Sequence, residues 1–381
     1  MRFFEFANPL VEDELLMEAA RIQHAEDVVF WEGSKGAIRA LHSLRNMDKG
    51  SHKDTTIKWD GSPAVIFGRD EEGNFIFTDK SGFTAKGYDG KAKSAEHLEK
   101  MLTSRPGFAK NPKGYGPFIA AMKSAYNSFE RAVPLDYRGF FKGDMLYFTT
   151  PKVKNGEYVF TPNIVTYSVD VDSELGNKIG KSVAGVVIHR QVGPDGTESP
   201  LDGYDIFQGE EVLVVPPVTV EKEPFVPHDS LNILEKIIKK DAAAIDTMLD
   251  TDTLRALKIT DFPQVLYAYT NSKVDTGLTE MGKDFGAWLK NSKLSERKKQ
   301  NIAQYISENS AGWKALWEVV GGIMKAKDEI IYDIDSQGST VKQSIAGQGG
   351  GEGYVLAHPE GDIKLVPREY FSKANRAARM T

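Results

Sequence analysis

The fold is decided by the stretch Thr55-Thr56-Ile57-Lys58-Trp59-Asp60-Gly61-Ser62-Pro63-Ala64-Val65. Residues 55–57 are β-branched and favour an extended backbone, whereas Asp60-Gly61 favours a tight turn before a second strand at 64–67. Lys58 is therefore expected at the end of a strand beside a turn, where its amine can reach a ligand. A surface turn with a solvated lysine is the alternative for these residues alone, and the remaining sequence must distinguish the two.

The composition excludes several classes of site. The chain has 381 residues, of which 40% are hydrophobic and 27% charged, and it is long enough for one to three domains. Cysteine is absent, which excludes disulfides, thiolate zinc sites and cysteine nucleophiles. The seven histidines include no close pair at a metal-ligand spacing. Any metal is therefore expected to be a hard cation held by carboxylates and phosphate.

Charge and hydropathy bear on partners and location. No apolar run is long enough to cross a bilayer, and we find no charged-then-apolar leader typical of export. With the lack of cysteine, this predicts a cytoplasmic protein without membrane contact. The net charge is −6, so nucleic acid is expected to bind only through local basic patches. Residues 86–113 and 283–299 are candidate patches, and ordinary solvated surface is the alternative for both.

Hydrophobic periodicity divides the chain into four segments. In chain order, we expect an N-terminal helical segment, a strand-rich core, a helical insertion and a closing strand-rich segment with a basic helix, at 1–50, 51–217, 228–336 and 337–381. Residues 218–227 are rich in Pro and Val and are predicted to be a linker. The glycine-rich stretch 338–353 lacks the Gly-Lys-Ser/Thr of a phosphate loop, so a flexible connector is expected there.

Other predicted strands carry residues suited to nucleotide chemistry. One begins Glu352-Gly353-Tyr354-Val355-Leu356, and the next is Ile363-Lys364-Leu365-Val366. Earlier in the chain, Asp144 lies in the segment 141–147 of a strand predicted at 137–148, and Tyr167 in the segment 164–167 of a strand predicted at 159–169. Together with Lys-x-Asp-Gly at 58–61, and in this order, these segments resemble the motifs of the covalent nucleotidyltransferases, the superfamily of ATP-dependent DNA and RNA ligases and mRNA capping enzymes.

The resemblance implies a fold and a set of site residues. The fold is α+β: an antiparallel-sheet nucleotidyltransferase domain of the ligase adenylation (ATP-grasp-like) type, interrupted by the helical insertion. Lys58 would be the catalytic nucleophile that forms a covalent lysyl-AMP from ATP, and Asp144 and Glu352 would hold Mg²⁺ or Mn²⁺. The implied nucleotide-binding residues are Ile57, Asp60, Gly61, Lys80, Tyr167, Val355, Lys364 and Arg368.

The chemistry explains why these residue types should converge. A free lysine has a pKa of about 10.4 and is protonated at neutral pH. Neighbouring cations such as Lys364 and Lys80, with a bound metal, would lower the pKa of Lys58 and free its lone pair. Lys364 would also hold the α-phosphate, while Tyr167 and Val355 would sandwich the base. Core packing for the tyrosine and plain solvation for the charged groups are the structural alternatives.

The sequence departs from the family pattern at three places. Ligases commonly have Arg soon after Lys-x-Asp-Gly, but Ser62-Pro63-Ala64 follows here, and Lys80 is the substitute that we assign. The last motif is usually Lys-x-Lys, but Val366 occupies the second position and Arg368 would compensate. Too few residues follow Val366 for the C-terminal OB β-barrel of DNA ligases and capping enzymes, so we expect none.

Three functions are compatible with the sequence. The leading one is an ATP-dependent polynucleotide ligase that joins 5′-phosphate and 3′-hydroxyl ends, of RNA rather than DNA. The second is a nucleotidyltransferase with another acceptor, either a capping-type guanylyltransferase or a protein-modifying enzyme. The third is a non-catalytic protein that keeps the fold and binds nucleic acid or protein through its helical insertion.

Overall fold

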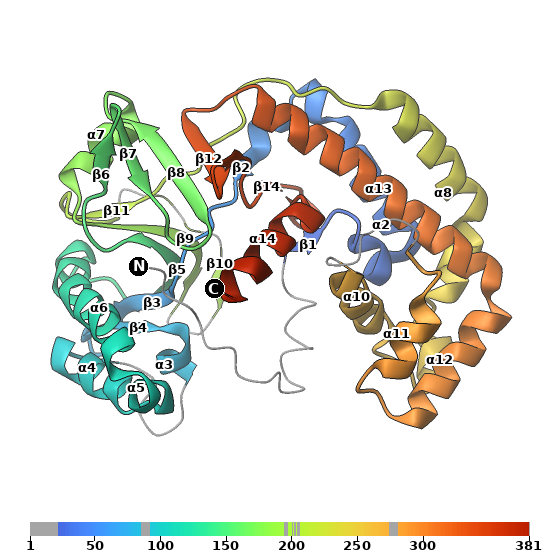
Figure 1. Cartoon of the computed structure of the whole chain (residues 1–381), viewed down its shortest axis with the longest axis horizontal. Coiled ribbons are helices and arrows are strands. Elements are labelled where there is room, and N and C mark those ends of the chain that lie inside the picture. Colours follow the sequence, from blue (N-terminus) through green and yellow to red (C-terminus); the bar gives the residue numbers. More distant parts are fainter. Residues whose placement is uncertain are drawn as a thin grey trace. The chain divides into compact units, whose positions relative to one another are not determined.

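The computed structural model describes residues 22–84, 92–193, 197–199, 201, 203, 206–273 and 281–380. The first part of the N-terminal helical segment expected at 1–50 and the first part of the candidate patch at 86–113 lie outside these residues. The described chain forms two compact units (Figure 1). We call Trp59–Val218 with Thr340–Gly351 the β-rich unit, and 22–58 with Thr219–Ser339 and 352–380 the helical unit.

The larger sheet of the β-rich unit is mostly antiparallel. Its strands follow the order β10-β9-β5-β3-β4, and β11 pairs parallel with β9. In chain order their bounds are β3 Ala64–Arg69, β4 Phe75–Asp79, β5 Gly139–Tyr147, β9 Ala184–Val192, β10 Glu198–Ser199 and β11 Val212–Val214. The strand predicted after Lys-x-Asp-Gly is thus β3, and it pairs with β5 in the register Ala64↔Asp144.

Helices cover one face of this sheet. The helices of the β-rich unit are α3 Lys80–Thr84, α4 Ala95–Thr103, α5 Pro106–Lys110, α6 Pro112–Ala132 and α7 Glu174–Lys181. Along α6, Met122, Ala125 and Phe129 recur at helical spacing and are buried. The Phe129 ring lies 4.7 Å from that of Phe67 on β3, so the stripe builds the core between helix and sheet.

The second sheet of the β-rich unit is antiparallel and joins distant parts of the chain. Its order is β13-β12-β8-β7-β6, with bounds β6 Lys152–Lys154, β7 Glu157–Phe160, β8 Val165–Asp170, β12 Val341–Ile345 and β13 Gln348–Gly349. β12 pairs with β8 in the register Gln343↔Tyr167. The prediction of a flexible connector at 338–353 was therefore wrong, because the hydrophobic Val341 and Ile345 are buried in this sheet.

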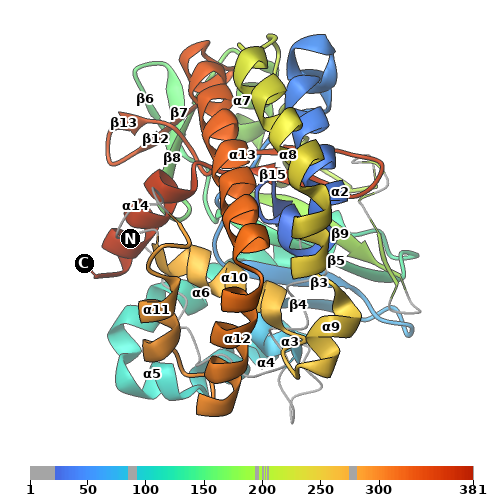
Figure 2. The same ribbon diagram turned by 90° about the vertical axis from the view of Figure 1, so that its right-hand side faces the viewer.

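The helical unit combines eight described helices with a small sheet. The helices are α2 Val28–Arg45, α8 His228–Met248, α9 Thr251–Ala256, α10 Phe262–Ser272, α11 Phe285–Asn291, α12 Glu296–Glu308, α13 Ser310–Ser336 and α14 Arg368–Met380. Three of them, α2, α8 and α13, run side by side in Figure 2. Two short 3₁₀ turns, Met47–Lys49 and Ser51–Asp54, connect α2 to the sheet.

The sheet of the helical unit has four strands in the order β1-β15-β14-β2. Their bounds are β1 Gln23–His24, β2 Thr55–Ile57, β14 Tyr354–Leu356 and β15 Ile363–Leu365. β14 is antiparallel to both of its neighbours, while β1 pairs parallel with β15. Residues that alternate along these strands, such as Ile57, Tyr354 and Leu365, are buried, so one face of the sheet is part of the core.

The α+β class is confirmed, but the division into domains differs from the prediction. The helices expected at 228–336 are present as α8 to α13. They do not form a separate insertion, because 22–58 and 352–380, with all four strands of the small sheet, belong to the same unit. The burial of Val28, Leu41 and Leu44 of α2 explains the difference, since that helix packs on α8 and α13.

Candidate active site

Lys58 is held beside Glu352 by the pairing of two strands that are far apart in the sequence. β2 pairs antiparallel with β14 in the register Ile57↔Tyr354, and the Lys58 amide donates to the Gly353 carbonyl at 2.9 Å. The side chains of Lys58 and Glu352 form an ion pair and are 28% and 15% exposed. The predicted nucleophile and one predicted metal ligand therefore meet in the helical unit.

The glycine after Glu352 is required by a close approach of two strands. Gly353 has φ of +120°, and a Cβ at this position would lie 2.1 Å from the carbonyl oxygen of Leu365 on β15. Any other residue would push β14 away from β15. The Glu-Gly pair of the motif thus fixes the spacing between the strand that follows Glu352 and the strand that carries Lys364.

Lys364 and Val355 lie on the same face of the small sheet. In the strand pairing, Val355 lies opposite Thr56 of β2 on one side and opposite Lys364 of β15 on the other. All three residues are partly exposed, whereas the residues next to them along each strand are buried. Burial, with the nearby charge of Lys58, lowers the pKa of Lys364 to about 8. The register therefore brings together the residues that the resemblance assigns to the nucleophile, the base and the α-phosphate.

His24 was not predicted as a site residue, although it neighbours Lys364 directly. It lies on β1, where its Cα partner in the parallel pairing is Lys364. The imidazole is only 8% exposed, and burial lowers its pKa well below the ordinary value, helped by the charges of Lys364, Arg368 and Lys327. His24 is therefore neutral at physiological pH. Its isolated position in the sequence gave no signal, because only the pairing of β1 with β15 brings it to the site.

Arg368 is part of a buried ionic cluster and does not lie on the open face of the sheet. It is 1% exposed and donates to Asp27 Oδ1 at 2.7 Å and to Asn271 Oδ1 at 2.7 Å. Lys327, also fully buried, donates to both carboxylate oxygens of Glu26 at 3.0 and 2.9 Å. The prediction that Arg368 binds nucleotide is therefore corrected: its guanidinium is committed to protein groups.

Asp60 and Tyr167 have structural roles in the β-rich unit. Asp60 is 6% exposed, and its carboxylate accepts from Asn163 Nδ2 at 2.9 Å and from the amides of Ile164 and Val165 at 3.0 and 3.2 Å. The Asp60 amide donates to the Tyr167 hydroxyl at 2.6 Å. Asp60 therefore ties the turn of the opening motif to the start of β8.

The stacking role predicted for Tyr167 is not what the structure shows. Its ring is fully buried, with centroids 4.6 Å from the Trp59 ring and 5.5 Å from the Phe160 ring. The alternation along β8 turns Tyr167 toward the core, where aromatic packing and its hydroxyl hydrogen bond hold it. Tyr167 is therefore a core residue, as in the structural alternative, and no face of its ring is open to a base.

Asp144 lies close to the glycine of the opening motif. A Cβ on Gly61 would meet the Asp144 Cβ at 2.5 Å, so only glycine lets the turn pass this point of β5. The Asp144 carboxylate is 26% exposed and contacts His189 Nε2 on β9 at 2.9 Å. Asp144 is therefore an accessible acid with one histidine partner in the β-rich unit.

Lys80 begins helix α3 and is exposed. The residue before it, Asp79, accepts two hydrogen bonds from the Arg105 guanidinium, both at 2.6 Å. This bidentate pair joins the end of β4 to the segment before α5 and fixes where Lys80 emerges. The structure adds no contact that assigns Lys80 to a nucleotide, so its role stays a prediction.

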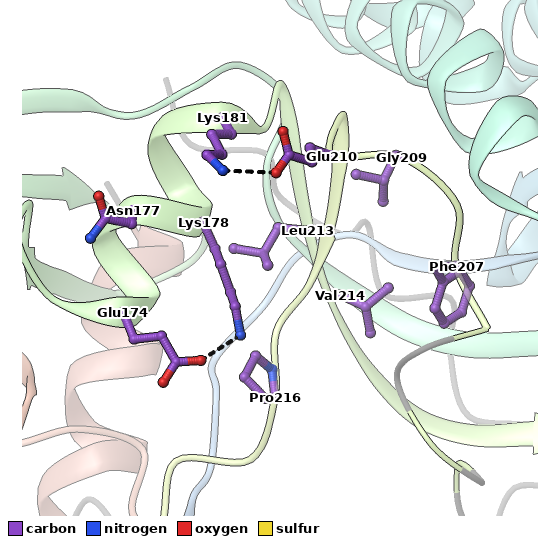
Figure 3. Close-up of a pocket in the computed structure, with 11 residues that line it drawn as sticks. Glu174, Asn177, Lys178, Lys181, Phe207, Gly209, Glu210, Leu213, Val214 and Pro216 are labelled. Atoms are coloured by element: carbon purple, nitrogen blue, oxygen red, sulfur yellow. Dashed lines mark hydrogen bonds and ion pairs between the residues drawn. The ribbon is translucent and has the colours of Figure 1, made fainter.

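A cavity of about 480 Å³ lies elsewhere in the β-rich unit, between α7 and β11 (Figure 3). Two of its lining lysines are paired with acids: Lys178 donates to Glu174 at 2.8 Å and Lys181 to Glu210 at 2.9 Å. The cavity therefore offers little net positive charge to a phosphate. None of its lining residues is a predicted site residue.

Comparison with known proteins places the chain in a family. A model for a family of unknown function, DUF6267, matches residues 20–379. The chain belongs to this family. No curated protein and no solved structure matches the chain. Among the described residues, no helix of this family member is both long and apolar enough to span a membrane.

The titration of Lys364 gives a prediction for anion binding. Its pKa of about 8 means that the ammonium is half neutralised near pH 8 in the free protein. A bound phosphate favours the charged form, so affinity for inorganic pyrophosphate should fall above pH 8, by up to about tenfold per pH unit for one linked proton. Lys364→Arg keeps its charge and should remove the fall. Calorimetric titration at pH 6.5 to 9.5 measures both proteins, and parallel pH profiles would contradict the prediction.

Proposed function

We propose that this protein is a covalent nucleotidyltransferase that transfers AMP from ATP to Lys58. The observation that carries the proposal is the convergence of Lys58 with Glu352 and Lys364 at one small sheet, although Lys58 precedes Glu352 by 294 positions in the sequence. Chance matches to short motifs have no reason to meet in space. The charge of Lys58 also contributes to lowering the pKa of Lys364, as expected when two lysines lie near one another.

The first step would form one bond and break one. The neutral amine of Lys58 attacks the α-phosphorus of ATP, a P–N bond forms, the bond to the bridging oxygen breaks, and pyrophosphate leaves. The amine releases its proton to solvent. Lys364 would bind an oxygen of the α-phosphate and stabilise the charge that develops there. In the free protein the Lys58 amine forms an ion pair with Glu352, so this pair has to open before attack.

A divalent cation fits the acids that are present. Carboxylate oxygens suit Mg²⁺, which usually takes one or two protein carboxylates together with waters and substrate phosphates. Glu352 offers one such group beside Lys58 in the helical unit, and the metal-binding role of Asp144 stays a prediction. In the described part of the chain, no three His, Asp or Glu side chains gather as a ready-made metal site. When bound, the cation would offset charge on the phosphoryl oxygens.

The acceptor that we propose is a polynucleotide 5′-phosphate, which is then joined to a 3′-hydroxyl. We propose RNA rather than DNA as the polymer that is joined. Transfer to another acceptor, such as capping-type chemistry or protein modification, shares the first step. These alternatives differ in the nucleotide and in the fate of the covalent intermediate.

Intact-mass spectrometry after incubation with ATP and Mg²⁺ tests the proposal. We expect the protein to gain the mass of one AMP, and to lose it on addition of pyrophosphate. An adduct with GTP alone would favour the capping-type alternative. No adduct with either nucleotide, in protein that still binds pyrophosphate, would overturn the proposed enzyme and leave a non-catalytic binding protein.

The basic run at 283–299 contains fewer free charges than its sequence suggests. Lys298 forms an ion pair with Asp261 at 2.5 Å, and Lys299 donates to the Lys290 carbonyl and to Glu296, both at 2.9 Å. These two lysines therefore connect α12 to neighbouring segments of the helical unit. The side chains of Lys290, Lys293 and Arg297 are exposed and remain the candidates for contact with nucleic-acid phosphates.

A triple substitution of these exposed residues tests the nucleic-acid partner. Changing Lys290, Lys293 and Arg297 to Ala should lower RNA affinity and reduce the salt dependence of binding by up to about three units, roughly one for each phosphate that is no longer neutralised. Lys58 adenylation should stay close to normal. The control is the double change Lys35→Ala and Lys325→Ala, two lysines that are each 77% exposed in the same unit. Equal salt slopes for the two variants would show that the run is only solvated surface.

A further inference from the structure

Strand β11 of the β-rich unit is joined to its sheet on one side. Among the described strands it pairs with β9 alone. The Ala184 amide of β9 donates to the Glu211 carbonyl at 3.1 Å, and the Val215 amide donates to the Val186 carbonyl of β9 at 2.9 Å. Backbone groups alternate in direction along a strand, so every second residue, beginning at Glu211, bonds to β9.

The residues between them, Val212 and Val214, turn their N–H and C=O groups away from β9. They are only 5% and 8% exposed, and both line the cavity of about 480 Å³ between β11 and α7. Backbone groups that are removed from bulk water cost free energy when they stay unpaired. A row of donors and acceptors spaced two residues apart is the complement of one extended peptide backbone.

Two other sheet edges of the β-rich unit are protected from an added strand, whereas β11 is not. β6 is Lys152-Val153-Lys154 with all three residues exposed, and lysines on an edge strand discourage pairing. At the outer edge of β4, the Phe77 amide donates to the Ala92 carbonyl at 3.3 Å. β11 is Val-Leu-Val and carries no charged side chain. Its edge therefore lacks both kinds of protection.

The cavity beside β11 has apolar side chains in its lining and exchangeable charges at its rim. Phe207 and Leu213 are among the lining residues, and Figure 3 shows the Leu213 side chain directed from β11 toward α7. Lys181 of α7 donates to Glu210, just before β11, at 2.9 Å, and their side chains are 60% and 68% exposed. Exposed ion pairs of this kind are weak, so a bound chain can replace either partner.

We propose that this cavity, the β11 groove, binds an extended peptide segment of another protein, added as a strand to β11. The peptide backbone would exchange hydrogen bonds with Val212 and Val214. Apolar side chains at alternate peptide positions would pack on Leu213 and Phe207, with polar residues between them. Helix α7 bounds the groove opposite β11, so the groove admits a single strand rather than the sheet of a second copy. This binding site is separate from the proposed adenylation chemistry.

Selection of phage-displayed random heptapeptides on the intact protein tests the proposal. Phage that bind Val214→Pro protein are removed first. Proline lacks the N–H that faces the groove, and the bonds to β9 made by the neighbouring residues stay in place. We expect enriched peptides whose affinity, measured by fluorescence anisotropy, falls about tenfold or more in Val214→Pro. Val153→Ala, which changes an apolar residue that is 56% exposed in the same unit, should leave the affinity unchanged. No enrichment would overturn the proposal.

An N-methyl scan of a selected peptide distinguishes strand addition from docking by side chains. Methylation should weaken binding about tenfold or more at every second amide and have little effect between them. A profile without this alternation would overturn the proposal. So would a dimer that sedimentation velocity detects in the unchanged protein and not in Val214→Pro, because a second copy would then occupy the edge. If circular dichroism shows that Val214→Pro does not fold, Leu213→Trp, which fills the groove and keeps the backbone donors, replaces it and should abolish peptide binding.

Discussion

Lys58→Ala should abolish the AMP adduct completely. No other group can replace the amine as nucleophile in a phosphoramidate, so the expected loss is at least about 10⁴-fold in rate rather than a partial decrease. The fold should persist, because the side chain is partly exposed and makes one ion pair at the sheet edge, of a kind that contributes about 1 kcal/mol or less. Intact mass after incubation with ATP and Mg²⁺ measures the adduct, and circular dichroism measures the fold.

The matched control for this prediction is Lys53→Ala. Lys53 is exposed in the 3₁₀ turn just before β2, and its replacement removes the same charge from the same segment. We expect its adduct yield to equal that of the unchanged protein. Full labelling of Lys58→Ala would show that another residue is the nucleophile, and peptide mapping of the adduct would identify it.

Lys327→Met should destabilise the protein by about 3–5 kcal/mol, the largest effect that we expect on folding. The Lys327 ammonium and the Glu26 carboxylate are both fully buried, with N–O distances of 3.0 and 2.9 Å. Methionine fills a similar volume but leaves the buried Glu26 carboxylate with only the longer contact from Arg368, at 3.4 Å. Urea-induced unfolding followed by circular dichroism gives the change in free energy.

Two further variants make this result interpretable. Lys325→Met lies on the same helix, where the lysine is 77% exposed and 4.0 Å from Glu329, so its cost should be below about 0.5 kcal/mol. Combining Lys327→Met with Glu26→Gln removes both charges and should recover part of the stability, because no buried charge is left alone. A double variant as unstable as the sum of the singles would refute the pairing argument.

The part of the site that is built by neighbouring strands could be predicted from the sequence. Lys58, Glu352 and Lys364 each lie at or beside a short β-branched or apolar run, and such runs identify strands whose ends carry polar groups. Gly353 and Gly61 lie where two strands or a strand and a turn approach closely. Glycine beside a strand or in a turn is a local sequence pattern that indicates such an approach. The order of these segments along the chain resembled that of the family motifs, which was enough to expect them to meet. The strand pairing of the small sheet does bring Lys58, Glu352 and Lys364 together.

The buried part of the site could not be predicted in this way. Whether Tyr167 turns toward the core or toward a ligand depends on which face of β8 packs on Trp59, and a single strand pattern does not contain that information. The hydrogen bonds of Arg368 to Asp27 and Asn271 join three helical segments. In the sequence, these three polar residues are indistinguishable from ordinary helix-surface residues. Their burial follows only from tertiary packing.

The pairing of Lys58 with Glu352 also sets the earliest point of synthesis at which the proposed adenylation could occur. The two residues are separated by 294 positions along the chain. A ribosome adding 5–20 residues per second needs roughly 15 to 60 s to travel from one codon to the other. During that interval the nascent chain carries the lysine without its acidic partner or Lys364. Chains that end before the last two strands of the small sheet should therefore not be labelled by ATP.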